Sequence, residues 1–275
     1  MTFLPNSDNL FTFKNERFEA DYIKFGSGKN TLIILPGLSL KPVTLSAPAI
    51  VQAYSVFEKN YTVFLFEKRK KVPAGFSIGD IADDTAEMMR QLGLENAFVF
   101  GVSQGGMTAQ LLASKYPELV RGLVLASSLS KSDPVFLRLM NEWQAFAAAG
   151  DRVSLNRSFF KNVYSKEYFE KYRDVFASLE NEGTDEELAR FLCMVQACRE
   201  FDSTQDIKNI KCPALVMGAE GDIAVTADSQ RKLAALLGTE PIIYNGYAHA
   251  VYDEAPDFKQ KILAFTDALC IKNPL

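Results

Sequence analysis

The sequence predicts an α/β fold: a mostly parallel, eight-stranded sheet flanked by helices, with an α-helical cap inserted between two of its strands. Short apolar runs, typical of strands that are covered on both faces, alternate with helical patterns along most of the chain. Between about Lys131 and Asp206 this alternation stops, and only helical patterns occur. We therefore expect residues 1–130 and 207–275 to form the core and residues 131–206 to form the cap.

The predicted strands are short runs of aliphatic, β-branched and aromatic residues that end at turn residues. The first two are expected to form a hairpin of half-exposed strands, and the later ones are apolar throughout. In chain order they lie within Phe11–Phe25 and at Thr31–Leu35, Tyr61–Glu67, Asn96–Gly101, Gly122–Ser127, Ala214–Ala219 and Pro241–Gly246.

Two helices are expected between strands of the core. The first covers residues 77–93, where Ser77 and Asp80 form a capping pair and Gly93 ends the helix. The second covers Gln104–Tyr116, directly after a strand. Strands and helices that alternate in this way predict right-handed crossovers, with helices on both faces of the sheet.

The cap segment contains three helical patterns, of which the last begins at Thr184 with a capping box to Glu187. Their apolar stripes are Phe136, Leu139, Met140, Trp143 and Phe146; Tyr168, Tyr172, Val175, Phe176 and Leu179; and Leu188, Phe191, Leu192 and Val195. An insertion of this kind can cover the C-terminal edge of the sheet as a lid.

The composition is that of a folded globular protein, with 275 residues of which 48% are hydrophobic. The balance of 30 basic and 34 acidic residues gives a net charge of −4 and no electrostatic basis for binding nucleic acid. The spacing of the cysteines predicts reduced thiols: Cys193, Cys198, Cys212 and Cys270. Residues 1–12 do not resemble a signal peptide and no apolar run approaches about 20 residues, so we expect a cytoplasmic protein without membrane contact. The oligomeric state is left open.

Ser103 lies between Gly101 and Gly105, directly after an apolar strand and directly before a helix. A Gly-x-Ser-x-Gly stretch in this context is typical of a nucleophile elbow. Side chains at the two glycines would collide with the adjoining strand and helix, and the strained turn exposes the serine Oγ. The alternative is an ordinary turn serine.

The chain has one histidine, His249, which follows the last predicted strand. It is the candidate base that removes the proton from Ser103, because a serine hydroxyl is a poor nucleophile by itself. Asp222, in the turn after the strand Ala214–Ala219, is the candidate carboxylate that orients the histidine. Glu220 and Asp133 are the alternatives for this role, and Asp222 could instead cap a helix near residue 224.

Acyl transfer also requires donors for an oxyanion. The backbone N–H of Gln104, directly after the nucleophile, is one candidate. The loop Leu35–Pro42 follows an early strand, and its Gly37 allows the backbone to turn inward, so the N–H of Leu38 is the second candidate. An ordinary strand-to-helix loop is the alternative.

Taken together, these segments resemble the α/β-hydrolases with a helical cap. The resemblance covers nearly the whole chain and rests on PGLS, GVSQGG, GAEGD and YAHAVYDEAP. Two departures stand out. Pro36-Gly37 replaces the His-Gly pair that is frequent in the oxyanion loop. The segment FEKRKKVPAGFS, Phe66 to Ser77, lacks the His and Arg spacing of the Asp-x-Arg-Gly-His-Gly-x-Ser stretch that many members have after the fourth strand. The basic cluster Lys68–Lys71 in that second segment either attracts an anionic substrate or is a solvated loop.

A serine nucleophile argues against dehalogenase and epoxide hydrolase chemistry, for which relatives use a carboxylate. The expected reaction is hydrolysis through an acyl-enzyme on Ser103, without a metal or organic cofactor. We expect a carboxylic-ester hydrolase that acts on a small, mostly apolar substrate. The alternatives are a C–C bond hydrolase, a lactonase, a thioesterase, a slow-turnover ligand receptor and a purely structural relative. Aromatic side chains of the cap either line a moderately sized apolar pocket or pack the cap onto the sheet.

Overall fold

The computed structural model describes residues 9–272 and contains one eight-stranded sheet, so most of the segment tested for a signal peptide lies outside it. The strand order is β1-β2-β4-β3-β5-β6-β7-β8. The bounds are β1 Leu10–Lys14, β2 Glu19–Phe25, β3 Asn30–Leu35, β4 Tyr61–Phe66, β5 Ala97–Val102, β6 Val120–Ala126, β7 Ala214–Ala219 and β8 Ile242–Tyr244. All the predicted strands are present, and the last is shorter than predicted.

The sheet is mostly parallel, as the sequence predicts. Strands β1 and β2 form an antiparallel hairpin, β2 pairs antiparallel with β4, and every other pairing is parallel. Parallel pairing brings the C-terminal ends of β3, β5, β6, β7 and β8 to one edge of the sheet. The loops that carry the candidate site residues all leave from this edge.

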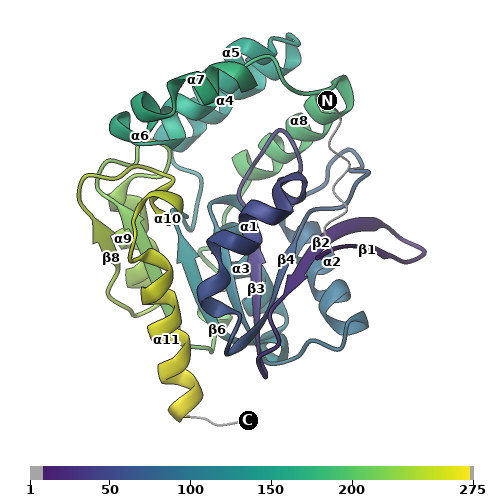
Figure 1. Cartoon of the computed structure of the whole chain (residues 1–275), viewed down its shortest axis with the longest axis vertical. Helices are drawn as coiled ribbons and strands as arrows, with labels where there is room; N and C mark the ends of the chain where they lie inside the picture. The colour runs from purple at the N-terminus through teal and green to yellow at the C-terminus, as the bar shows by residue number, and fades with distance from the viewer. Residues whose placement is uncertain (1–8, 273–275) are drawn as a thin grey trace.

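Helices cover both faces of the sheet (Figure 1). Their bounds are η1 Val43–Ser46, α1 Ala47–Ala53, η2 Ser55–Phe57, α2 Ile78–Gln91, α3 Gln104–Lys115, η3 Pro117–Leu119, η4 Asp206–Asn209, α9 Ala227–Leu236, α10 Val251–Glu254 and α11 Phe258–Lys272. The predicted capping pair at the start of α2 is confirmed, because Ser77 accepts from the Asp80 N–H and Asp80 accepts from the Ser77 N–H. No helix among residues 9–272 is long and apolar enough to cross a membrane.

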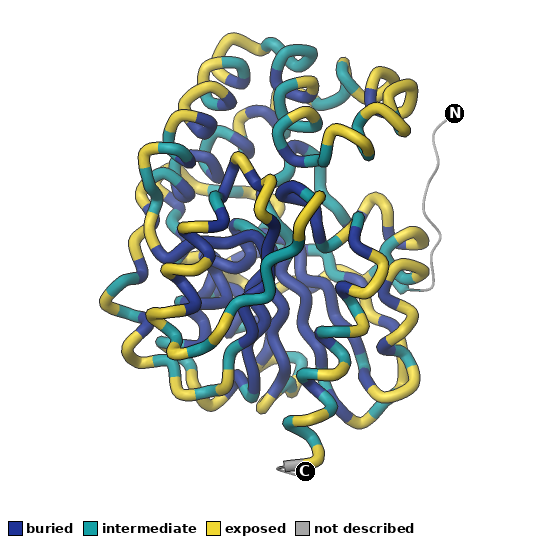
Figure 2. The backbone as a smooth tube through the Cα atoms, turned by 90° about the vertical axis from the view of Figure 1, so that its left-hand side faces the viewer, coloured by how far each residue is buried: buried dark blue, intermediate teal, exposed yellow. Residues whose placement is uncertain are grey.

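Two apolar cores lie on the two faces of the sheet. One packs α2, α3 and α9 against it, and the other packs α1, η2 and α11 against the opposite face. Figure 2 shows the sheet as the continuous buried centre of the molecule. Strands buried on both faces explain why the apolar runs in the sequence do not alternate with polar residues.

A third apolar core lies between the sheet edge and helices α4–α8, which are called the cap from here on. The cap helices are α4 Pro134–Ala148, α5 Arg152–Val163, α6 Lys166–Lys171, α7 Arg173–Leu179 and α8 Asp185–Arg199, and they follow β6 and precede β7. Figure 1 shows them above the edge of the sheet where the parallel strands end. The predicted capping box of Thr184 and Glu187 begins α8.

The middle of the cap differs from the prediction. The helix α5 was not predicted, and the stripe from Tyr168 to Leu179 forms two short helices that are interrupted at Tyr172. Val175 in this stripe is 53% exposed. Tyr168 and Phe176 lie on either side of this interruption, in one cluster of aromatic rings with Phe160 of α5 and with Tyr164, which directly follows α5.

Candidate active site

Ser103 occupies a strained turn between β5 and α3. Its backbone has φ 51° and ψ −114°, which costs a non-glycine residue about 1–3 kcal/mol. A Cβ at Gly101 would lie 2.4 Å from the Gly105 carbonyl oxygen, and one at Gly105 would lie 1.9 Å from the Leu35 carbonyl oxygen. The tight turn therefore requires both glycines, as predicted.

Two serines that directly follow β6 donate hydrogen bonds to the backbone of Ser103 and His249. Ser128 Oγ donates to the Ser103 carbonyl oxygen at 2.9 Å, and Ser127 Oγ donates to the His249 carbonyl oxygen at 2.7 Å. Both are buried, and Ser127 has a φ of 47°. Sequence reasoning missed these residues, although a serine-rich stretch at the C-terminal end of a predicted strand was a signal for them.

His249 and Asp222 form a buried pair. The distance from His249 Nδ1 to Asp222 Oδ2 is 2.8 Å, and the residues are 5% and 3% exposed. An ionised carboxylate only accepts hydrogen bonds, so this contact places the imidazole proton on Nδ1 and leaves Nε2 as an acceptor. The structure thus brings together the predicted base and the predicted orienting carboxylate.

The other contacts of Asp222 keep its carboxylate in place. Oδ1 accepts the N–H groups of Ala224 and Val225, at 2.9 and 2.8 Å. Oδ2 also accepts from Gln230 Nε2 at 3.2 Å. Gln230 of α9 is fully buried and was not predicted as part of the site. Asp222 therefore stabilises its own turn and holds His249, whereas the cap of α9 is Thr226.

The alternative carboxylates have other partners. Glu220 is exposed and forms an ion pair with Arg231. Asp133 caps α4 through the N–H groups of Val135 and Phe136, and it also accepts from Ser229. Neither contacts His249 in the described part of the chain, so the structure favours Asp222.

Ser103 and His249 line one small cavity between the sheet edge and the cap. Leu38 lines it as well, and Gln104 follows Ser103 at the start of α3. Their N–H groups as oxyanion donors stay a prediction. The cavity volume is about 30 Å³, enough for one or two water molecules. The sequence predicted a moderately sized pocket, and the cavity beside Ser103 is smaller than predicted.

Most of the cavity wall is apolar. Its apolar side chains include Phe136, Met140, Trp143, Phe159, Val163 and Ala224. No Lys, Arg, Asp or Glu is among the lining residues in the described part of the chain. Other cap aromatics, such as Phe160 and Phe176, stack on each other at 4.8 Å between ring centroids. Phe191 of α8 belongs to one apolar cluster with Leu40 and Ile78 of the core, so cap aromatics both line the cavity and pack the cap onto the core.

Phe159 separates the cavity from a larger groove. The groove has a volume of about 480 Å³ and lies between the loop after β3 and helices α5 and α7. Phe159 is the one residue that lines both spaces in the described structure, and its ring lies 4.9 Å from that of Trp143. The cavity and the groove therefore meet at this side chain.

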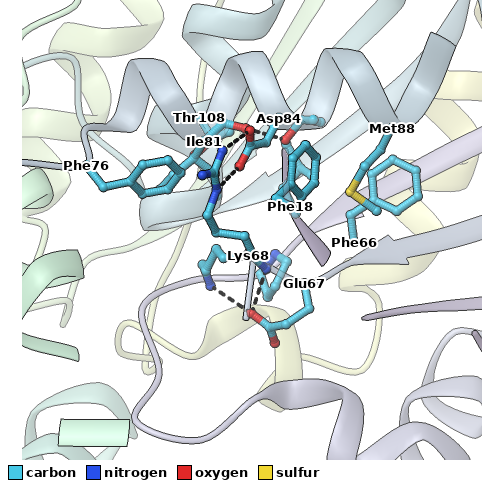
Figure 3. A pocket seen from close by; sticks show the side chains of 14 residues that line it. Phe18, Phe66, Glu67, Lys68, Phe76, Ile81, Asp84, Met88 and Thr108 are labelled. Carbon is cyan, nitrogen blue, oxygen red and sulfur yellow. Dashed lines mark hydrogen bonds and ion pairs between the residues drawn. The ribbon is translucent and has the colours of Figure 1, made fainter. Parts of the chain in front are cut away.

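The basic cluster Lys68–Lys71 does not behave as one loop. Lys70 and Lys71 are exposed, as a solvated loop requires. Arg69 is largely buried and pairs with Asp84 of α2. Figure 3 shows Asp84 beside an internal pocket, distinct from the Ser103 cavity, that is lined by Phe18, Phe66, Phe76 and Thr108 among others. Lys68 is only 8% exposed. The solvated-loop interpretation is therefore wrong for the first two residues, and neither lines the cavity with Ser103.

The four cysteines are free thiols in the structure, and Cys198 of α8 is buried. Its Sγ lies 3.1 Å from Gln104 Nε2, which also donates to the Met194 carbonyl oxygen. Burial raises the pKa of the Cys198 thiol to about 12, so it is neutral at physiological pH. The first residue of α3 is thereby tied to the cap.

The sequence model of the α/β hydrolase fold matches residues 64–256. The chain belongs to the α/β-hydrolase family. Its similarity to an enol-lactonase from Burkholderia xenovorans LB400 extends over 93% of this chain and 99% of that chain, with a TM-score of 0.80 and 20% identity. A hydrolase from a deep-sea metagenome, MGS-M2, has a TM-score of 0.83 at 22% identity and covers 94% and 97%.

Curated relatives are similar at the level of sequence. "Putative carbamate hydrolase RutD" of Rhizobium rhizogenes is 26% identical, over 72% of this chain and 77% of its own length. The 3-oxoadipate enol-lactonase 2 of Acinetobacter baylyi is 22% identical, over 65% and 68%. The fold and these relatives support hydrolysis as the reaction of this protein, but they do not identify the substrate.

Proposed function

We propose that this α/β-hydrolase cleaves small, mostly apolar carboxylic esters through an acyl-enzyme on Ser103. The observation that carries the proposal is one apolar cavity lined by a strained elbow serine and by a histidine that is paired with a buried aspartate. This is the set of groups that attack on a carbonyl carbon requires.

The reaction begins when His249 Nε2 takes the proton of Ser103 as its Oγ attacks the carbonyl carbon. The N–H groups of Leu38 and Gln104 bind the developing oxyanion. His249 then protonates the leaving alkoxide, and the alcohol departs. Water, deprotonated by His249, releases the acid from Ser103. Asp222 keeps the proton on Nδ1 throughout and stabilises the imidazolium.

The cavity wall supports a neutral substrate. An anionic substrate would normally meet a cation in its site, and no Lys or Arg lines the described cavity. The volume of about 30 Å³ holds one or two water molecules, so an ester enters only when the cap or Phe159 moves, and we expect a short acyl group to require the smallest movement. Lactones and carbamates belong to the same reaction class, and relatives bear names for hydrolysis of both.

The test is a panel of matched substrates at one pH: acetyl, butyryl and octanoyl esters of one phenol, a neutral enol-lactone, an aryl carbamate, a thioester and a vinylogous diketone. We expect the highest kcat/KM for the acetyl or butyryl ester. Ser103→Ala, as the matched control, should remove all of this activity. Preferential cleavage of the diketone or the carbamate, or equal rates with Ser103→Ala, would contradict the proposal.

A further inference from the structure

A buried charge cluster lies behind the loop that follows β3. Glu67 and Lys68 come directly after β4, and Arg190 comes from the cap helix α8. Glu67 Oε1 lies 3.0 Å from the Arg190 guanidinium and 3.7 Å from Lys68 Nζ, and the three side chains are 3%, 10% and 6% exposed. Figure 3 shows Glu67 and Lys68 together on one side of the internal pocket.

The Lys68 ammonium contacts the loop after β3, which is the predicted oxyanion loop. Its Nζ donates to the Gly37 carbonyl oxygen at 2.6 Å. The sheet register explains this contact, because Ile34 of β3 pairs with Leu65 of β4. Gly37 and Lys68 each lie three residues beyond that pair, so the two loops leave the sheet side by side.

The contact fixes the direction of the N–H group that the proposed mechanism uses as an oxyanion donor. The Gly37 carbonyl and the Leu38 N–H belong to one planar trans peptide, in which they point in opposite directions. A donor fixed on the carbonyl therefore also fixes the direction of the N–H. The loop lies beside the nucleophile, since a Cβ at Gly37 would lie 3.3 Å from Ser103 Cβ. Leu38 itself lines the cavity.

We propose that Lys68 is a positioning residue for the oxyanion hole, which aims the Leu38 N–H and places a buried positive charge behind it. The inference rests on the proposed function of Ser103. Two cations and one carboxylate leave one positive charge in excess in this cluster. In a poorly solvated site that charge stabilises an oxyanion more than a neutral carbonyl. Lys68 should therefore affect the chemical step more than the binding of the ground state.

The variant Lys68→Met removes the ammonium and keeps most of the side-chain volume. Glu67 would retain three partners, namely Arg190 and the backbone N–H groups of Val43 and Lys68. Because the carboxylate stays satisfied, we expect the variant to fold. Lys71→Met is the matched control, since it removes the same charge from an exposed position of the same loop.

The experiment measures the rate at which a fluorophosphonate labels Ser103, which does not depend on knowing the substrate. Ser103 Oγ forms a bond to phosphorus as the P–F bond breaks, fluoride leaves, and His249 takes the hydroxyl proton. The phosphoryl oxygen occupies the oxyanion hole as charge develops. Titrating the probe separates the maximal rate constant, kinact, from the half-saturating concentration, KI. The thermal midpoint of each variant is measured alongside.

We expect Lys68→Met to lower kinact about 10- to 100-fold and to change KI less than about 3-fold. Lys71→Met should match the wild type in both constants. Lys68→Arg, which keeps a charged donor, should recover part of the loss, and it also serves if Lys68→Met does not fold. A Lys68→Met protein whose kinact is unchanged, or whose loss is not reduced in Lys68→Arg, would overturn the role of Lys68. A wild type that does not label would instead remove the proposed function, and with it this inference.

Discussion

At the scale of single residues, the site depends on contacts that the sequence only partly reveals. Ser103, Asp222 and His249 could be chosen as candidates from the sequence because each lies in the turn or loop that follows a predicted strand. Gln230 and Ser127 were missed: Gln230 follows Asp222 by only eight residues but reaches it from the buried face of α9, and Ser127 acts on the His249 carbonyl, 122 residues away in the chain. Such contacts are set by the packing of helix against sheet, which local sequence patterns do not encode.

The burial of Lys68 is another feature that could not be predicted from the sequence. A run of four basic residues is usually solvated, and the sequence gives no sign that its first member is buried. Its burial follows from the register of β3 and β4 and from Glu67 and Arg190, which supply the countercharge and the cap contact. Burial lowers the pKa of the Lys68 ammonium, and the Glu67 carboxylate opposes that change.

The role of Asp222 can be tested by comparing two carboxylates of one turn. Asp222→Asn should lower kcat about 1,000- to 10,000-fold, because an amide can favour the wrong tautomer of His249. Glu220→Gln, two residues away and exposed, should leave kcat within about 2-fold. Steady-state kinetics on the best ester of the panel measures both. Equal losses in the two variants would mean that Asp222 is not the orienting carboxylate.

At the scale of elements, the nucleophile elbow and helix α2 were predicted well. The elbow combines a strand, two glycines and a helix within a few residues, so its signal is local. The middle of the cap was predicted less well, since its aromatic stripe continues across the break at Tyr172. Packing of α6 and α7 onto α5 decides where the helices end.

Glycine substitutions in the elbow and in α2 should have opposite effects on stability. Gly105→Ala should lower the free energy of unfolding by about 3 kcal/mol or more, because its Cβ would lie 1.9 Å from the Leu35 carbonyl oxygen. Gly79→Ala in the first turn of α2 meets nothing closer than Ser77 Oγ at 3.4 Å, and should raise it by about 0.5–1 kcal/mol. Urea unfolding at equilibrium measures both values. A Gly105→Ala protein as stable as the wild type would contradict the close approach of β3 and α3.

At the scale of the whole molecule, the site lies between the sheet edge and the cap, and residues of both parts line the cavity. Arg190, Met194 and Cys198 are spaced at i, i+4 and i+8 on α8, and each contacts the core or the elbow. Helix α6 has no buried residue, and Phe176 is the one buried residue of α7. The cap is therefore bound to the core mainly through α8, and α6 and α7 contribute little buried surface.

The division between cavity and groove predicts a change in substrate range. Phe159→Ala should join the cavity of about 30 Å³ to the groove of about 480 Å³. The ratio of kcat/KM for the octanoyl ester to that for the acetyl ester should then rise about 10-fold or more. Phe160→Ala, its neighbour, lines only the groove and should leave the ratio within about 3-fold. An unchanged ratio in Phe159→Ala would show that substrate enters elsewhere.

The fold as a whole brings Ser103 and His249, which are far apart in the sequence, to one cavity, and the central claim is that Ser103 is the nucleophile there. Mass spectrometry after reaction with a fluorophosphonate tests it most directly. The wild type should gain one label, mapped to the peptide that contains Ser103, whereas Ser103→Ala should gain none and His249→Ala should react at least about 100-fold more slowly. An unlabelled wild type, or a Ser103→Ala protein that labels at the wild-type rate, would contradict the claim.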